Sequence, residues 1–523
     1  LDTDAESLTL RAATSPDMSN PFTNPIGLGL AYLRQNLLSS VLGCLLCYLV
    51  SLVISRLFFH PLCGIPGPKL ASLSEWYSFY YNFIVDGQYS KSFEALHRKY
   101  KSPVIRIGPN AVHVNDPQFY EEVFGIKTNY YKEPAFYQAL GAEGALASIL
   151  DPHEHRLYRN HLRPLFSARS TALVTPQLEI ELQKAAAILN THRQENTPLN
   201  IQQLFRAFTV SVPKSLSLNV TTLTASSRIF NSFPVVQFPC IKSIQFYLPF
   251  DWGERLTPEF TAFKQKCDTW IKKAHARRDA GVALERKTLF DYYLELDGNP
   301  EQVIRTVPQP MEDSFNFLTA GTESTAYSLS CTTFYILRNP EVLKKLREEL
   351  NASVEFIRDS FDPKRIQALP YLTAVIKETM RLSTAVPGSL PRVTPPGGAT
   401  VGSFYIPAGT VVSVSHLSVT QNETIFPEAS KFRPERWLGE GSKALDKWHV
   451  GFSKGPRRCI GMNADRHSSL AYLELFCAIA YLFARFDMVL HETDEKSMEW
   501  VDRISARNHS DVQIKVLTDL WAA

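Results

Sequence analysis

The segment from Phe452 to Gly461 limits the possible folds of this chain more than any other. Its sequence, FSKGPRRCIG, places a Phe, two Gly, an Arg and a Cys at the spacing F-x-x-G-x-R-x-C-x-G. Backbone N–H groups and a following helix N-terminus can hold a cysteine as a thiolate, and glycines let the chain pass close to a flat ring. The segment therefore predicts a loop in which the thiolate of Cys459 binds a haem iron.

Two further properties of this loop agree with that prediction. Arg457 is placed to pair with a haem propionate, and a Cys ligand favours O–O cleavage at the iron more than a His or Met ligand does. The alternative is an inert buried cysteine in a Gly-rich turn. That alternative explains a lone cysteine but not the whole string.

Composition excludes several other classes of protein. The 523 residues are 45% hydrophobic with a net charge of +3, which gives no electrostatic indication of nucleic-acid binding. Eight cysteines in a chain of this length are too few for a disulfide scaffold and fit a reducing compartment.

An uncharged run from Leu37 to Ser55 lies between Arg34 and Arg56 and predicts a single transmembrane helix. A cleaved signal peptide and a buried core helix are the alternatives, and Met18 offers a second possible start of the chain. The proline-rich stretch that follows predicts a stiff, extended hinge. We expect an N-terminal tail (1–34), an anchor (35–59), a hinge (60–69) and a catalytic domain (70–523).

The rest of the chain predicts a mainly α fold with a minor β region. Residues 102–116 alternate apolar and polar around Gly-Pro, as in a small hairpin, and a second β-rich patch is expected at 390–416. Helical spacing dominates from about 153 to 385. Within it, Met311–Arg338 predicts a long helix that ends before Asn339-Pro340.

The middle of that long helix carries the stretch AGTEST, residues 320–325. Gly321 leaves space for a bulky group, and Glu323 lies beside the hydroxyls of Ser324 and Thr325. An acid next to hydroxyls suits proton delivery. A solvated polar face of the helix is the alternative.

The pattern E-x-x-R occurs twice, at Glu355/Arg358 and at Glu378/Arg381. The first pair lies at a helix end and is predicted to be on the surface. The second lies in a strongly apolar helix, where a buried pair needs a further partner. Arg436, in the stretch FRPERW, is the predicted third member of a structural lock.

Together these segments resemble the haem-thiolate monooxygenases, the cytochrome P-450 superfamily, from about Pro61 to the C-terminus. Ser324 stands where the family usually has Thr, and Ser453 is a mild variation in the cysteine loop. The resemblance implies the cytochrome P-450 fold behind one N-terminal transmembrane helix, and haem b with Cys459 as axial ligand. It also implies propionate contacts from His155, Arg159 and Arg392 besides Arg457, and it assigns the lock to structure and haem retention. His153 and Arg156 compete with the His155/Arg159 pair.

The implied reaction is hydroxylation or epoxidation of a lipophilic substrate with dioxygen. Electrons would come from NADPH-cytochrome P-450 reductase, with cytochrome b5 as a further donor. The implied location is the endoplasmic reticulum membrane, single-pass, with a cytosolic catalytic domain. A basic face is expected to dock the donor, formed by Lys443, Lys447, Lys454, Arg457, Arg458 and Arg466. An ordinary solvated surface is the alternative.

In finer detail the chain resembles fungal secondary-metabolism enzymes, including trichodiene-oxygenase-like members. A terpenoid substrate is the first expectation, and a polyketide or aromatic metabolite the second. Candidate pocket stretches are 136–140, 385–390 and 503–508, and the apolar stretch 235–249 is a candidate for membrane contact. A haem-thiolate isomerase or dehydratase, a haem sensor and a membrane-anchored binding protein remain as alternatives.

Overall fold

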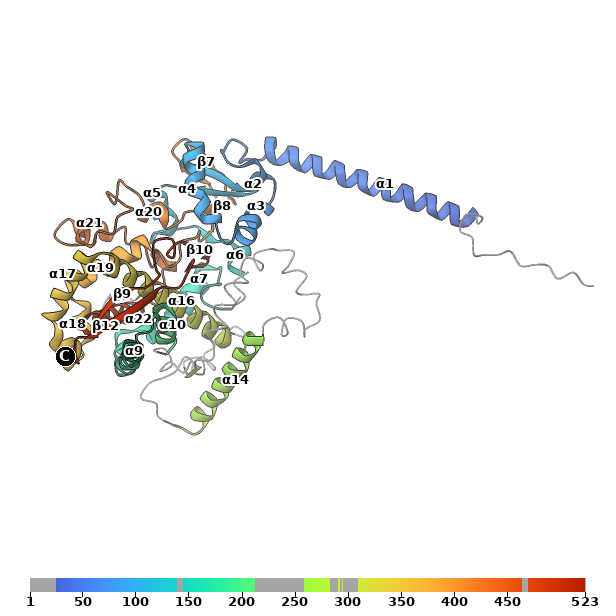
Figure 1. The fold of residues 1–523 in the computed structure, drawn as a ribbon. Coiled ribbons are helices and arrows are strands. Elements are labelled where there is room, and N and C mark those ends of the chain that lie inside the picture. Colours follow the sequence, from blue (N-terminus) through green and yellow to red (C-terminus); the bar gives the residue numbers. More distant parts are fainter. Residues whose placement is uncertain are drawn as a thin grey trace, which may run out of the picture. The chain divides into compact units, whose positions relative to one another are not determined.

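The structure is a computed structural model that describes residues 25–138, 144–211, 258–282, 290–291, 294, 309–462 and 469–522. It divides into two compact units, Leu1–Cys63 and Gly64–Ala523, which are described separately. Figure 1 labels the elements.

The first unit contains the predicted apolar helix. Helix α1 (Pro25–Ile54) continues into a short π-helical turn, η1 (Ser55–Phe59). Its candidate span, Arg34–Phe59, has 26 residues and a mean hydropathy of 2.5. At about 1.5 Å per residue this is about 39 Å, more than the ~30 Å hydrocarbon core of a bilayer. Its side chains are largely exposed, which fits a single membrane anchor.

The predicted hinge, residues 60–69, spans the boundary of the two units. In the first unit, Cys63 N donates to His60 O at 2.8 Å. In the second unit, Pro66 O accepts from Arg106 N at 2.7 Å, and a Cβ atom at Gly67 would collide with the Arg106 carbonyl. Pro66 and Gly67 therefore pack closely against the first strand of the second unit.

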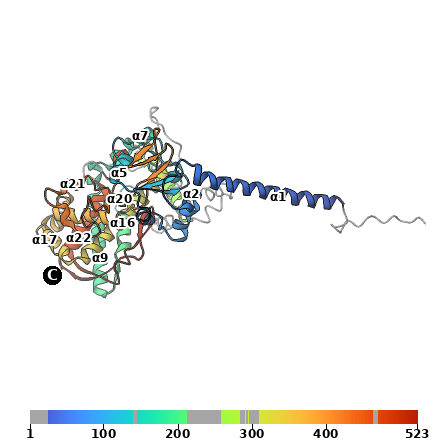
Figure 2. The same ribbon diagram turned by 90° about the horizontal axis from the view of Figure 1, so that it is seen from above.

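The helical part of the second unit is built around α22 (Leu470–Arg485), which is buried along almost its whole length. A helix that is apolar on every side is stable only inside a core. Figures 1 and 2 show α22 among the other helices and away from the larger sheet. The helices that pack directly against it are α9 (Thr175–Glu195), α16 (Gln309–Arg338), α17 (Pro340–Asn351), α18 (Pro363–Gln367) and α19 (Pro370–Leu382).

The remaining described helices are shorter or more peripheral. They are α2 (Lys69–Leu73), α3 (Trp76–Phe79), α4 (Tyr89–Tyr100), α5 (Pro117–Phe124), α6 (Pro134–Gln138), α7 (Pro152–Leu162), α8 (Ala168–Ala172), α10 (Ile201–Ser211), α14 (Pro258–Asp279), α20 (Leu417–Thr420) and α21 (Ser442–Asp446). Short π or 3₁₀ turns are η2 (Tyr80–Ile84), η3 (Arg163–Phe166), η5 (Glu355–Asp359), η6 (Pro434–Trp437) and η7 (Gly455–Arg457).

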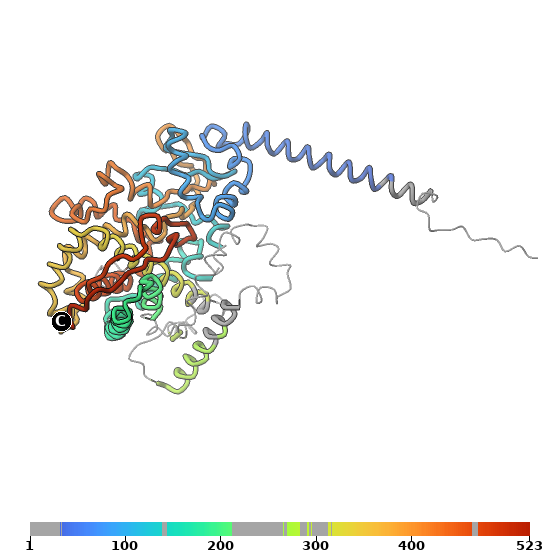
Figure 3. Tube along the Cα trace, in the orientation of Figure 1, coloured from blue at the N-terminus to red at the C-terminus, as the bar shows by residue number. Residues whose placement is uncertain are grey.

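The larger sheet has the order β1-β2-β8-β5-β3. The predicted hairpin is present as an antiparallel pair, with Val104 opposite Val114. Strand β8, from the predicted second β patch, joins β2 in parallel, so segments 300 residues apart lie side by side in Figure 3. The strands are β1 (Val104–Gly108), β2 (Ala111–Val114), β3 (Tyr131–Lys132), β5 (Arg392–Val393) and β8 (Val411–Ser413).

Three smaller sheets complete the described part of the unit, with orders β4-β12-β9, β10-β11 and β6-β7. Their strands are β4 (Leu199–Asn200), β6 (Ala399–Val401), β7 (Phe404–Ile406), β9 (Phe486–Leu490), β10 (Trp500–Arg503), β11 (Ser505–Asn508) and β12 (Gln513–Asp519). The prediction of a mainly α fold with a minor β region is confirmed.

Buried neutral histidines connect α4 to the larger sheet. Ser415 N donates to His113 Nε2 at 3.2 Å, and His113 Nδ1 lies 2.8 Å from His97 Nε2. His97 Nδ1 lies 2.7 Å from Ser102 O. Because His113 Nε2 accepts, His113 Nδ1 carries the proton that it donates to His97. The chain of bonds thus requires both rings to be neutral.

This arrangement predicts that the protein loses stability in acid. Burial lowers the pKa of His97 and His113, and burial lowers the pKa of His416 to about 4. Below pH ~6.5 the unfolded chain binds protons that the fold does not, so the free energy of unfolding falls by up to about 1.4 kcal/mol per pH unit for each such histidine. Urea unfolding at pH 7.5, 6.5 and 5.5 measures the slope, and His113→Gln should make it shallower. A variant with an unchanged slope would contradict the assignment.

Candidate haem-thiolate site

The cysteine loop is held against α5 by its backbone. Cys459 N donates to Phe452 O at 3.0 Å. Gly455 has a φ of +63°, and a Cβ atom there would collide with the carbonyls of Phe124 and Gly125. This position therefore requires glycine both for its conformation and for its close packing.

Cys459 is exposed in this structure, so its sulfur is open to a ligand. Desolvation by the surrounding protein acts to raise the pKa of its thiol, while backbone N–H groups of Gly461 and Met462 and the charge of Arg159 act in the opposite direction. A bound metal cation would favour the thiolate further, since a coordinating thiol is deprotonated outright.

Arg159 reaches the cysteine loop from α7. Its Nη1 donates to Arg458 O at 2.7 Å and its Nη2 to Cys459 O at 3.3 Å. Asp151 caps the start of α7 by accepting from Glu154 N at 2.7 Å. In this structure Arg159 thus fixes the carbonyls around Cys459, a contact that its predicted role with a propionate did not include.

A cluster of basic groups lies beside the loop: the buried Lys132, His155 and Arg392 and the partly buried Arg457, hereafter the basic cluster. Lys132 Nζ donates to Ala147 O, and Arg392 donates to Tyr137 Oη. Arg457 donates to Ile149 O at 2.8 Å and to Leu150 O at 2.7 Å.

The charges of the basic cluster act on one another. Burial lowers the pKa of Lys132 and the neighbouring Arg457, Arg392 and Arg159 add to the effect; the pKa of His155 falls to about 2, from burial and then the same cations. No described carboxylate forms an ion pair with any member of the cluster. A buried group of cations is stable when a bound anion compensates its positive charge. The two propionates of haem fit this requirement.

The long helix α16 borders the same region. Phe317 and Ile460, the residue after Cys459, both pack against the apolar cluster of Leu146, Leu162 and Leu165. A Cβ atom at Gly321 would meet nothing within 4 Å, so the helix offers open space at this point. Glu323 Oε2 accepts from Arg206 Nε of α10 at 3.2 Å. Ser324 Oγ donates to Ala320 O at 2.7 Å, and Thr325 is buried.

The structure brings the three predicted lock residues together around one buried carboxylate. Glu378 accepts from Arg381 Nε at 3.0 Å and Nη2 at 2.8 Å, and from Arg436 Nε at 3.0 Å. Arg433 N and Trp437 Nε1 also donate to it, at 2.9 and 2.8 Å. Arg381 in turn donates to the carbonyls of Thr420 and Lys431.

Some features were missed or differ from expectation. Lys132 was not predicted, because nothing in its local sequence distinguishes it from an ordinary strand residue; Tyr137 was expected only as part of the pocket stretch 136–140, not as a partner of Arg392. Of the expected basic face, Arg457 points to buried carbonyls and Lys454 pairs with Glu121 at 2.5 Å. Arg466 and the stretch 235–249 lie outside the described residues.

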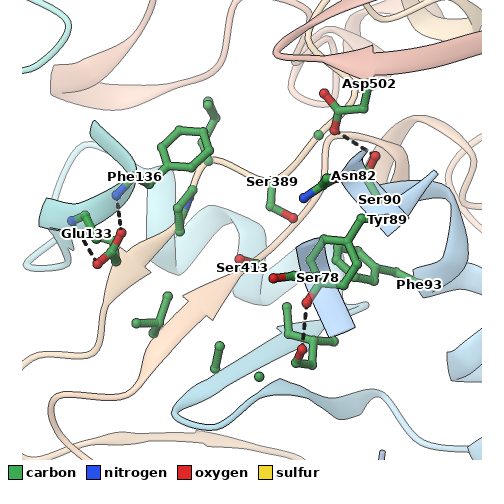
Figure 4. Close-up of a pocket in the computed structure, with 18 of the residues that line it drawn as sticks. Ser78, Asn82, Tyr89, Ser90, Phe93, Glu133, Phe136, Ser389, Ser413 and Asp502 are labelled. Atoms are coloured by element: carbon green, nitrogen blue, oxygen red, sulfur yellow. Dashed lines mark hydrogen bonds between the residues drawn. The ribbon is translucent and has the colours of Figure 1, made fainter. Parts of the chain in front are cut away.

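The three candidate pocket stretches meet in one cavity of about 320 Å³. Ile504, Val386 and residues 388–391 contribute to its wall, as does Phe136, which Figure 4 shows together with Ser389. Neither Cys459 nor Glu323 is part of this wall. Leu390 and Pro391 of the wall directly precede Arg392 of the basic cluster, so the cavity adjoins that cluster along the chain.

Comparisons with known proteins agree with this geometry. The cytochrome P450 family model matches residues 70–515. The chain is 60% identical over 479 residues to cytochrome P450 monooxygenase phqM of Penicillium fellutanum, covering 88% of each chain. It is 39% identical over 486 residues to cytochrome P450 monooxygenase cloA of Claviceps purpurea, covering 90% of this chain and 93% of the relative. The solved structure of retinoic acid-bound cyanobacterial CYP120A1 shares the fold, with a TM-score of 0.69, 20% identity, and coverage of 87% and 99%.

Proposed function

The chain belongs to the cytochrome P450 family, and we propose that it oxidises a lipophilic metabolite while anchored in the endoplasmic reticulum membrane. It is a cytochrome P450 monooxygenase with haem bound through a cysteine thiolate. The observation that supports the proposal is the surroundings of the cysteine loop: Arg159 donates to the carbonyls of Arg458 and Cys459, and Ile460 packs against the same apolar cluster as Phe317 of α16.

In this proposal the thiolate of Cys459 would bind the haem iron. Arg457 and Arg392 are the charged partners of the propionates, with hydrogen bonds from Lys132 and His155. Arg159 holds the carbonyls of the loop so that the sulfur stays in place. When bound, the haem supplies dioxygen activation at an iron whose thiolate ligand favours O–O cleavage.

The protein's own part in the chemistry is proton delivery from α16. Glu323 is held by Arg206, whose Nη1 also lies 3.9 Å from Asp511 Oδ1. Because Arg206 lies between these two acids, it can shift toward Asp511 and release the Glu323 carboxylate, which can then take up a proton and pass it inward. Ser324 can then donate the proton from its hydroxyl, by rotating away from Ala320 O.

Ser324→Ala is expected to lower product formation by about 10²-fold or more while NADPH consumption continues, because proton transfer by a placed group is worth about that much. Ser328→Ala is the matched control, since Ser328 Oγ bonds Ser324 O at 2.9 Å in the same way one turn later. The ratio of product to NADPH consumed is the measurement. Equal effects of the two substitutions would assign Ser324 to helix structure alone.

The anchor and an exposed apolar surface support the membrane location. Leu70, Trp76, Tyr80, Phe83 and Ile84, on α2, α3 and η2, are all exposed. Apolar side chains gathered at one surface suit contact with lipid. NADPH-cytochrome P450 reductase on the same membrane, with cytochrome b5 as a second donor, is the proposed source of electrons.

A terpenoid is the first proposed substrate class and a polyketide or aromatic metabolite the second. Optical titration of membranes that contain the haem-loaded protein tests this, with sesquiterpenes in one series and aromatic polyketides in another. A low-to-high-spin shift with one series identifies its class, and turnover should then require dioxygen, NADPH and reductase. Turnover without them would favour the isomerase or dehydratase alternative. Protein without a thiolate-type spectrum would refute the proposal.

A further inference from the structure

The cavity beside the cofactor region has an unusual charge. Three carboxylates, Glu75, Glu133 and Asp502, contribute to its wall, and no Lys, Arg or His is among the described residues that line it. Most of the rest of the wall is apolar or aromatic, including Phe79, Phe93 and Phe136. A wall of aromatic rings and carboxylates without cations is complementary to a cationic ligand with an apolar body.

Two of the carboxylates are already engaged in local structure. Both oxygens of Glu133 accept from the start of α6, from Ala135 N at 3.0 Å and Phe136 N at 2.6 Å. Glu75 accepts from Ser78 Oγ at 3.3 Å. Asp502 is therefore the carboxylate best able to meet a ligand.

Asp502 is held in place by its surroundings. Its Oδ2 accepts from Ser90 Oγ at 2.8 Å and its Oδ1 from Ile504 N at 3.0 Å (Figure 4). A Cβ atom at Gly388 would collide with the Asp502 carboxylate, so the absence of a side chain at Gly388 leaves the space that the carboxylate occupies. Ile504 has a φ of +72°, a strained conformation for a β-branched residue.

The carboxylate has acceptor capacity left and no cationic neighbour that neutralises it. A carboxylate offers about four lone-pair directions, and Asp502 uses two of them. The adjacent Arg503 pairs instead with Asp86, which is not part of the cavity wall. Nearby, the Ser389 hydroxyl also lines the cavity, is buried, and has no hydrogen-bond partner among the described residues.

We propose that this cavity recognises the cationic nitrogen of an amine-bearing lipophilic substrate, with the Asp502 carboxylate as its counter-ion. The inference rests on the proposed function, since it narrows the substrate class of the same enzyme. It is compatible with a terpenoid or an aromatic skeleton and adds a basic nitrogen to either. The apolar body would extend past Leu390 and Pro391 toward the cofactor region, which begins at Arg392.

The test compares two probes of one shape, 4-phenylbutyl-trimethylammonium and its uncharged isostere in which tert-butyl replaces trimethylammonium. A quaternary nitrogen cannot bind iron, so coordination to the haem does not contribute to the affinity, and the Asp502 variant assigns the preference to the cavity. Equilibrium dialysis with the full-length, haem-loaded protein in detergent should show about tenfold tighter binding of the ammonium probe. Asp502→Asn should remove most of this preference and leave the isostere's affinity within about twofold. Asp86→Asn is the matched control and should change neither.

Equal affinity of the two probes for the unmodified protein would overturn the inference, as would an Asp502→Asn variant that weakens both probes alike. Ser389→Lys is a second variant, for use if Asp502→Asn does not fold. It places a cation in the wall without removing a partner of Asp502, and it should also abolish the preference. The reduced, CO-bound spectrum is recorded in parallel. If the thiolate spectrum is intact and the protein binds both probes equally, only this inference is refuted. If the thiolate spectrum is absent, the proposed function is refuted.

Discussion

Cys459→Ser is expected to abolish monooxygenase activity and to remove the thiolate-type spectrum of the reduced, CO-bound protein. A serine hydroxyl keeps the size and the backbone contacts of the residue, including the bond from residue 459 N to Phe452 O. It does not supply the soft thiolate that favours O–O cleavage. The basic cluster remains in the variant, so some haem should still bind. We therefore expect the substitution to remove the catalytic activity while the fold is retained.

Cys63→Ser is the control for this experiment, because Cys63 is exposed and lies in the other unit. It should leave spectrum and turnover unchanged. The measurements are the haem content, the CO-difference spectrum and product formation with reductase. Activity retained by Cys459→Ser would sink the mechanism, and a spectrum lost equally in both variants would point to general instability.

Motifs with distinctive residue types were readable from the sequence because their chemistry is local. The loop around Cys459 and the stretch around Glu323 each carry their reacting groups within a few residues. The fold class followed from periodicity, and the long helix ends at Arg338 as its Asn-Pro stop predicted. Local spacing is enough where backbone geometry alone brings the groups together.

The parts that were not readable depend on tertiary packing. Lys132 enters the basic cluster only because β3 pairs with β5, which carries Arg392. Arg159 reaches the carbonyls of Arg458 and Cys459 only because α7 packs beside the cysteine loop, 300 residues further along the chain. Asp502 gains its place in a cavity from Gly388 and Ser90, both more than a hundred residues away. None of these neighbours is visible in a local pattern.

The two E-x-x-R patterns show the same limit. Burial separates them: the side chains of Glu378 and Arg381 are 0% and 1% exposed, whereas Arg358 is half-exposed and pairs with Asp359 at 2.6 Å instead of with Glu355. The prediction that Glu355 and Arg358 are exposed is therefore right, but the prediction that they pair with each other is wrong. The same E-x-x-R spacing forms a buried ion pair in one helix and no ion pair between its Glu and Arg in the other segment.

Glu378→Gln is expected to lower the free energy of unfolding by about 3–5 kcal/mol, because it removes the charge that compensates the buried guanidinium of Arg381. An amide presents one acceptor oxygen and an NH₂ donor where the carboxylate accepts from Arg381, Arg433, Arg436 and Trp437. At least one of these donors would then face another donor. A loss of this size is a large part of a stability of about 5–15 kcal/mol.

The matched control is Glu355→Gln, the same substitution in the exposed copy of the pattern, for which we expect a change within about 0.5 kcal/mol. Urea unfolding of the detergent-solubilised holoproteins measures both, and the haem retained at each urea concentration is recorded. Arg436 joins α19 to the stretch that leads into the cysteine loop. Haem loss should therefore begin at lower urea in Glu378→Gln, before the helices unfold. If haem release and helix unfolding shift together in both variants, the lock stabilises the fold as a whole and has no separate part in holding the cofactor.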